Sequence, residues 1–234
     1  LGDAYVTAMC HDIEDPTFDA TALATNPYAQ VRPIHRPPRV PEDRHPHCAW
    51  TVTIDPSHVP PKMEPHTEAL GRTAAVATEL SPIDGAGEGN HDYSGPLLSD
   101  LRFADFSKSA LVRIAEEVCL QQHMLTLGFL MGVRKRTDEA SALDLARKQL
   151  TGLAGIASER IHRALGTPQS FAGLAAVLDV HPVFSPYHYV ERTVEHDSHG
   201  LTLHIHRRGG AHVDGAWPTL VDSDHLGALD ALVR

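Results

Sequence analysis

Few of the features that identify common protein classes occur in this sequence of 234 residues. Its three cysteines, Cys10, Cys48 and Cys119, are odd in number and widely spaced, and no CxxC pair exists. This cysteine usage favours a reducing, cytoplasmic setting. The first residues lack the charged n-region of a secretory signal, and the missing initiator methionine suggests that an N-terminal part is absent.

Basic and aromatic residues are scarce as well. The chain has 20 Lys and Arg against 30 Asp and Glu, a formal net charge of -10, and it holds only 2 Trp, 5 Tyr and 6 Phe. Nucleic-acid binding is driven mainly by Lys and Arg side chains that contact phosphates. We therefore predict no nucleic-acid partner.

No apolar run approaches the length of about 18 residues that a membrane-spanning helix requires. The most apolar window, 124–133, is interrupted by Gly128 and Gly132 and is followed by Arg134, so we interpret it as part of a buried helix. The hydrophobic share of 42% and the charged share of 21% are those of an ordinary globular protein with a core. We predict a soluble protein with no membrane association.

Widespread catalytic motifs are also missing, namely GxSxG, GxxxxGK, GxGxxG and HExxH. Their absence argues against serine hydrolases, nucleotide enzymes and zincin proteases. The block Gly89-Asn90-His91-Asp92 resembles the GNHD block of metallophosphoesterases, in which the Asn and His serve a two-metal centre. That family also carries a downstream GHxH, which this sequence lacks, so the chain is not assigned to it.

What the sequence does have in excess is histidine, at 17 residues. Such enrichment is compatible with metal binding, with proton transfer or with a polar surface that faces solvent. The count alone does not decide among these three, so the placement of individual histidines must.

The longest predicted helix covers residues 105–136. Its apolar side chains form a broad face that we expect to be buried: Leu111, Val112, Ile114, Ala115, Val118, Leu125, Phe129, Leu130 and Val133. Glu116 and His123 are seven positions apart, so they point in nearly the same direction between apolar neighbours. Polar groups buried in this way need partners. They are either a metal or proton-transfer pair, with Cys119 nearby, or structural groups bonded to another segment.

A second helix is predicted to end near Leu165. Its Glu159 and His162 form an ExxH pair that resembles the ligand pattern of di-iron carboxylate proteins. The apolar stripe of this helix lies on the other side, so we expect the pair to face solvent. A di-iron site is therefore not predicted.

A hairpin is predicted from strands 187–195 and 201–207. His204 and His206 share one face of the second strand, an HxH arrangement in which two imidazoles converge on zinc or iron. The arrangement resembles the HxH of cupin barrels, but Arg207 and the residues after it stand where a glutamate is expected. The pair is either a metal site, with a third ligand from His188, His212 or Asp214, or a polar edge that faces solvent.

These segments predict an α+β fold. Two long helices and a shorter one over 169–178 pack on a small antiparallel sheet, with a last strand over 217–221 and a closing helix over 224–233. A long Pro-rich segment, 1–95, is irregular or extended with one or two strands. It includes a loop over 17–31 and a strand over 47–55. The remainder, 96–234, holds the helical pair, the hairpin and the closing helix and continues the same domain.

The functional prediction is a metal-dependent enzyme, using iron or zinc, that acts on a small organic molecule. Glu116 and His123 are the candidate acid/base groups, and His204, His206 and His123 are the candidate metal ligands. The alternative is a non-catalytic protein. It would be a ligand-binding domain for a small molecule or a subunit of a larger assembly, as a homo-oligomer or with a partner subunit.

Overall fold

The computed structural model describes residues 2–60, 62, 65–94, 100–221 and 225–233, and it divides the chain into two units. The first unit is Leu1–Pro65 and the second is His66–Arg234. Each is described by itself below. The division that the sequence predicted, between residues 95 and 96, lies outside the described residues.

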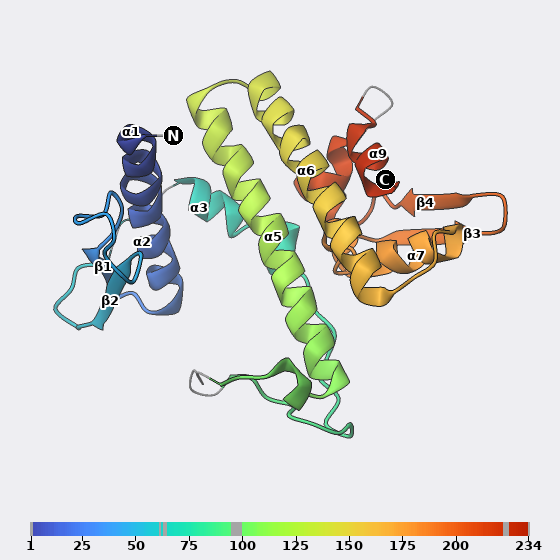
Figure 1. Ribbon diagram of the computed structural model, residues 1–234, viewed down its shortest axis with the longest axis horizontal. Helices are drawn as coiled ribbons and strands as arrows, with labels where there is room; N and C mark the ends of the chain where they lie inside the picture. The colour runs from blue at the N-terminus through green and yellow to red at the C-terminus, as the bar shows by residue number, and fades with distance from the viewer. Residues whose placement is uncertain (1, 61, 63–64, 95–99, 222–224, 234) are drawn as a thin grey trace. The chain divides into compact units, whose positions relative to one another are not determined.

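The first unit joins a helical segment to a two-stranded sheet (Figure 1). Its elements are α1 (Asp3–Thr7), the π-helical turn η1 (Ala8–Ile13), α2 (Glu14–Thr25), β1 (Ala29–His35) and β2 (Ala49–Ile54). The predicted loop over 17–31 is wrong, because the chain stays helical as far as Thr25. Pro16 lies two residues after the start of α2, which continues directly from η1.

Strands β1 and β2 pair antiparallel, with Val31 opposite Val52 and Pro33 opposite Trp50. The strand predicted over 47–55 is therefore confirmed by β2. Trp50 packs edge-on against Phe18 of α2, with ring centroids 4.5 Å apart, so an aromatic contact joins the helix to the sheet.

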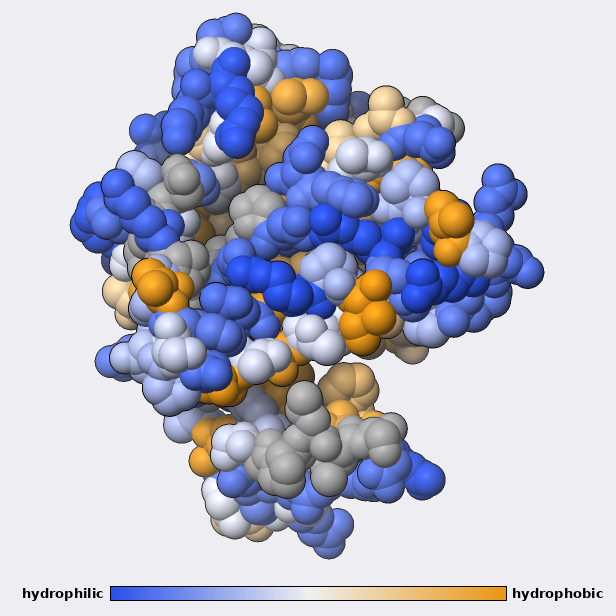
Figure 2. Space-filling model, turned by 90° about the vertical axis from the view of Figure 1, so that its left-hand side faces the viewer, coloured by the Kyte–Doolittle hydropathy of each residue, from blue (hydrophilic) through white to orange (hydrophobic). Residues whose placement is uncertain are grey.

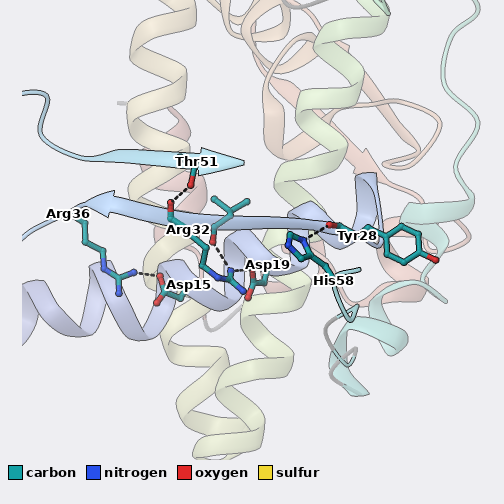
Figure 3. Close-up of polar contacts among 8 residues, drawn as sticks. Asp15, Asp19, Tyr28, Arg32, Arg36, Thr51 and His58 are labelled. Atoms are coloured by element: carbon teal, nitrogen blue, oxygen red, sulfur yellow. Dashed lines mark hydrogen bonds and ion pairs between the residues drawn. The ribbon is translucent and has the colours of Figure 1, made fainter. Parts of the chain in front are cut away.

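Ion pairs and backbone contacts complete the first unit (Figure 3). Arg32 of β1 binds Asp19 of α2 at 2.8 Å, and Arg36 binds Asp15 one turn earlier on the same helix. Nδ1 of His58 is hydrogen-bonded to the carbonyl of Tyr28 at 3.0 Å. These contacts connect segments whose sequence alone predicted irregular structure.

The second unit is mainly helical. Its elements are α3 (Pro65–Leu70), α4 (Ala74–Ala77), the 3-10 turn η2 (Phe103–Asp105), α5 (Lys108–Arg136), α6 (Glu139–Leu165), α7 (Phe171–Asp179), the 3-10 turn η3 (Pro182–Phe184), β3 (Arg192–His196), β4 (Leu201–Ile205), α8 (Gly210–Asp214), the 3-10 turn η4 (Trp217–Leu220) and α9 (Gly227–Val233). With the antiparallel pairs β1–β2 and β3–β4, the mixed α and β composition is confirmed.

Local sequence signals explain the ends of the two long helices, which run side by side in Figure 1. The hydroxyl of Ser107 accepts a hydrogen bond from the N–H of Ala110 and caps α5. The carboxylate of Asp138 caps α6 in the same way through the N–H of Ser141. Gly166 ends α6 with a φ of +61°, a left-handed conformation that glycine adopts without strain.

The core of the second unit lies between α5, α6 and the segments that follow them. Small residues of α6, including Ala146 and Ala154, let its buried face approach its neighbours closely. Trp217 is buried in the same cluster, but in η4, so the strand predicted over 217–221 is wrong. The predicted closing helix is present as α9, although residue 224, its predicted start, lies outside the described residues.

The hairpin β3–β4 has one apolar and one polar face. Thr193 pairs with His204, and Glu195 pairs with Thr202. Leu201, Leu203 and Ile205 lie on the other face, packed against the core. Among the described residues, no helix is long and apolar enough to cross a membrane.

Candidate functional site

His123 lies in the core, on the buried face of α5. Its side chain is fully buried, and its Nε2 is hydrogen-bonded to the carbonyl of Ser185 at 3.0 Å. The ring meets Tyr189 and Trp217 edge-on, with centroids 5.1 and 5.7 Å away. A carbonyl only accepts, so Nε2 carries the hydrogen. Burial lowers the pKa of His123 to about 4, and the imidazole is neutral near pH 7.

Glu116, two turns earlier, is half-buried and holds a loop in place. Its two carboxylate oxygens accept hydrogen bonds from the backbone N–H and the hydroxyl of Ser81, both at 2.8 Å. Arg113 donates to the carbonyl of Ser81 and to Glu117. Both polar residues that the sequence singled out on this helix therefore bind a distant segment, as the structural alternative required.

His204 and His206 lie at the end of β4, away from the core. The side chain of His204 is exposed, and Nε2 of His206 is hydrogen-bonded to the hydroxyl of Thr193 at 3.0 Å. The described residues contain no group of three or more His, Cys, Asp and Glu side chains placed to hold a metal ion. The three predicted metal ligands are thus in two different environments, one in the core and one on an exposed strand.

Asp214, proposed as a further ligand, has its oxygens occupied by other donors. They accept hydrogen bonds from the backbone N–H groups of Ala74 and Ala75 at 2.8 and 2.9 Å. The hydroxyl of Tyr189 donates to the same carboxylate at 2.9 Å, and burial raises the pKa of this hydroxyl. The cluster connects α8 with α4, which is a structural role.

The two other candidate motifs have structural roles as well. Glu159 of the ExxH pair is exposed, as predicted, and binds Arg163 on the same helix, whereas His162 is half-buried, with its Nδ1 hydrogen-bonded to the hydroxyl of Thr167 at 3.0 Å. In the GNHD block, Gly89 has a φ of +95°, and a Cβ there would lie 2.7 Å from the backbone of Phe106. This close approach lets the N–H of Asn90 reach the carbonyl of Asp105 at 2.8 Å.

The surface has two hollows, of about 310 and 330 Å³, in which a small molecule could be sought. One is lined by Arg147, Lys148, Leu150, Thr151, Leu220, Val221, His225, Gly227 and Ala228. The other is lined by Ser81, Pro82, Asp84, Gly87, Ser107, Lys108, Ser109 and Val112. Ligand pockets enclose their ligand and are lined mainly by apolar and aromatic side chains. Both hollows are open to solvent, so neither encloses a ligand in this way.

The most unusual surface of the second unit is on the other side of α5. Val118, Leu125 and Phe129 keep 59%, 71% and 40% of their surface exposed. The sequence placed them on the buried face, and that prediction is wrong. The face opposite to them, with Leu127 and Leu130, packs into the core instead.

Spacing distinguishes this exposed face from scattered surface residues. Its members alternate at intervals of four and three: Leu111, Ala115, Val118, Gln122, Leu125, Phe129, Gly132 and Arg136. The spacing is that of the a and d positions of a heptad, the period of 3.5 by which helices pair in coiled coils, and five of the eight positions are apolar, the others being Gln122, Gly132 and Arg136. We call these eight residues the α5 stripe. The heptad spacing is the signal in the sequence that could have identified it.

Between Val118 and Gly132, the α5 stripe also lacks the charges expected of a helix that faces water. Residues 118–133 contain no Asp, Glu, Lys or Arg. On α6, the exposed Leu145 and Ile156 stand among charged neighbours such as Lys148 and Glu159. Separate hydrophobic residues among hydrophilic ones are also what the face in Figure 2 shows, and they are normal for a protein surface.

Comparisons with known proteins add no further assignment. No protein-family model, curated protein or solved structure matches this chain at a significant level.

Proposed function

We propose that this protein is a non-catalytic subunit that binds another protein helix through the α5 stripe. The observation that carries the proposal is the set of exposed apolar side chains, Ala115, Val118, Leu125 and Phe129, at heptad positions of a continuous helix of 29 residues. From Leu111 to Phe129 the stripe extends over roughly 27 Å at 1.5 Å per residue, enough for several layers of packed side chains.

The energetic argument favours a covered stripe. Fully burying a Val, Leu or Phe side chain contributes about 1.5–3 kcal/mol, and Val118, Leu125 and Phe129 realise only part of this in the isolated chain. A partner that covers all three supplies the remainder, several kcal/mol in sum. An uncharged helix of the same 3.5-residue period has the shape and chemistry to do so.

The metal-dependent enzyme remains a prediction with less support. It required His123, His204 and His206 to act on one ion. Nε2 of His123 is occupied by the carbonyl of Ser185, and Nε2 of His206 is bonded to Thr193. We therefore favour the alternative in which the chain acts by association.

Hydroxyl-radical footprinting of the dilute, isolated protein tests the accessibility of the stripe. We expect Leu125 and Phe129 to be modified readily and Leu127 and Leu130 to be protected. Protection of Leu125 and Phe129 in a monomer would contradict the proposal, because the stripe would then be covered by the chain itself.

A matched pair of variants tests its role in assembly. Leu125→Glu introduces a charge on the α5 stripe, and Leu145→Glu introduces the same charge at an exposed leucine of α6. We expect only Leu125→Glu to weaken binding of the partner helix. Circular dichroism should show that both variants are folded. An equal effect of the two would count against a specific docking surface.

A further inference from the structure

We infer that the occupant of the α5 stripe is a second copy of this chain, with the two α5 helices antiparallel. The inference deepens the proposed function and rests on it. It follows from the order of side chains along the stripe, from the charges at its ends and from the interior position of its one amide residue.

Antiparallel pairing brings the side chains of the stripe into complementary layers. In antiparallel coiled coils each layer joins an a position of one helix to a d position of the other. Centring two α5 helices on each other places Val118 opposite Phe129 of the second copy, Gln122 opposite Leu125, and Ala115 opposite Gly132. The same pairing places Leu111 opposite Arg136 at each end of the contact. The large side chains fill the four middle layers, and the small pair Ala115 and Gly132 lets the two helices approach closely.

Charge favours the same orientation. The helix ends in Arg134, Lys135 and Arg136, and a parallel pair would bring two such runs together. It would also align like ends of the two helix dipoles. In the antiparallel pair the two basic ends lie at opposite ends of the contact. The uncharged segment 118–133 of each copy then forms its middle, so the net charge of -10 adds little repulsion there.

Gln122 is half-buried at the centre of the stripe. A single polar residue at an inner position of a coiled coil restricts register and partner number, at some cost in stability. Here the two amides lie one layer apart, each beside Leu125 of the other copy. This single position disfavours sliding to a neighbouring register.

Sedimentation velocity of the full-length chain over a range of concentrations tests the association. We expect a reversible monomer–dimer equilibrium. Leu125→Glu should raise the dimer dissociation constant by about 100-fold or more, because it buries an unpaired charge. Leu145→Glu should change the constant by less than about threefold, since a lone charge at an exposed site has a small effect.

Disulfide trapping tests the orientation. In a background with Cys10, Cys48 and Cys119 replaced by serine, Val118→Cys and Phe129→Cys are prepared separately and then mixed under air oxidation. The antiparallel dimer predicts a disulfide between the two variants in the mixture, with little crosslinking of either variant alone. Crosslinks of each variant with itself would overturn the antiparallel arrangement and indicate a parallel one.

The measurements separate failure of this inference from failure of the proposed function. A monomer at every concentration, with Leu125 and Phe129 modified by hydroxyl radicals, overturns the second copy as occupant and leaves a docking surface for a different helix. A monomer in which both residues are protected overturns the inference and the proposed function together.

Discussion

The two faces of helix α5 are nearly equal in apolar character and opposite in their surroundings. Leu127 is 2% exposed, whereas Leu125, two positions earlier, is 71% exposed. The buried face also carries the more polar residues, Glu116 and His123, while the exposed face between Val118 and Phe129 has Gln122 as its one polar member. Hydrophobicity therefore does not decide which face enters the core.

Which face of α5 is buried depends on the groups from other segments that contact it. On the buried face, Glu116 accepts hydrogen bonds from Ser81, and Nε2 of His123 donates to the carbonyl of Ser185. The ring of His123 meets Tyr189 and Trp217 edge-on, while its Nδ1 is buried without a hydrogen-bond partner among the described residues. No comparable set of contacts covers Val118, Leu125 and Phe129 within the described second unit, as their exposure shows. An apolar face that the core does not cover indicates a surface that binds another protein.

The largest effect is expected from acid, which should act on two buried histidines: His123 on the buried face of α5, and His181 between α7 and η3. Burial lowers the pKa of both His123 and His181 to about 4, against 6.5 for the free side chain. Between these two pKa values the unfolded chain binds more protons than the native chain. The contribution of each histidine to the free energy of unfolding is therefore fully present above pH 6.5 and is lost as the pH falls towards 4. We expect a loss on the order of 3 kcal/mol for each histidine.

Urea unfolding between pH 4 and pH 7 measures this loss. His123→Leu should remove about half of the pH dependence, whereas Leu127→Ala should lower stability by a similar amount at every pH. A pH profile unchanged by His123→Leu would show that its imidazole is not buried in the neutral form.

The next prediction compares the same residue type on the two faces. Leu127→Ala should cost about 2–5 kcal/mol of unfolding free energy, because it leaves a cavity in the core. Leu125→Ala should cost less than about 0.5 kcal/mol in the monomer, since its side chain is exposed there. Denaturation at a concentration below the association midpoint checks both values, and similar costs would mean that the two faces are equally covered.

A smaller effect is expected where the buried face holds the loop at Ser81. Glu116→Gln keeps the shape of the side chain but replaces one acceptor oxygen with an amide group. We expect a loss of about 1–2 kcal/mol and faster hydrogen exchange at the N–H of Ser81. Asp144→Asn, which removes an exposed ion pair with Lys148, is the control and should cost less than about 0.5 kcal/mol.

The smallest effect is predicted for the histidines of β4. Protein purified without a histidine tag should contain zinc and iron well below one ion per chain by elemental analysis. His204→Ala combined with His206→Ala should shift unfolding by less than about 0.5 kcal/mol. Stoichiometric metal that disappears in this double variant would instead support the metal-dependent enzyme and contradict a purely non-catalytic role.

Many residues of the candidate site could be identified from the sequence, but their contacts and roles could not. Glu116 and His123 were identified as polar residues that need partners, because their helical phase places them between apolar neighbours. Their partners, Ser81 and Ser185, are far away in sequence and belong to segments without regular periodicity. The heptad spacing of the α5 stripe was present in the sequence, but the same apolar residues also fit a buried face.

Local chemistry, which the sequence contains in full, determined the helix boundaries and the hairpin. Ser107, Asp138 and Gly166 act on backbone groups within a few residues, so their effect does not depend on the rest of the chain. Only the tertiary structure decided the secondary structure of residues 17–31 and 217–221, and which face of α5 is buried. Those outcomes depend on contacts such as Phe18 with Trp50, or Trp217 with His123, because burial is a property of the neighbours that a side chain meets.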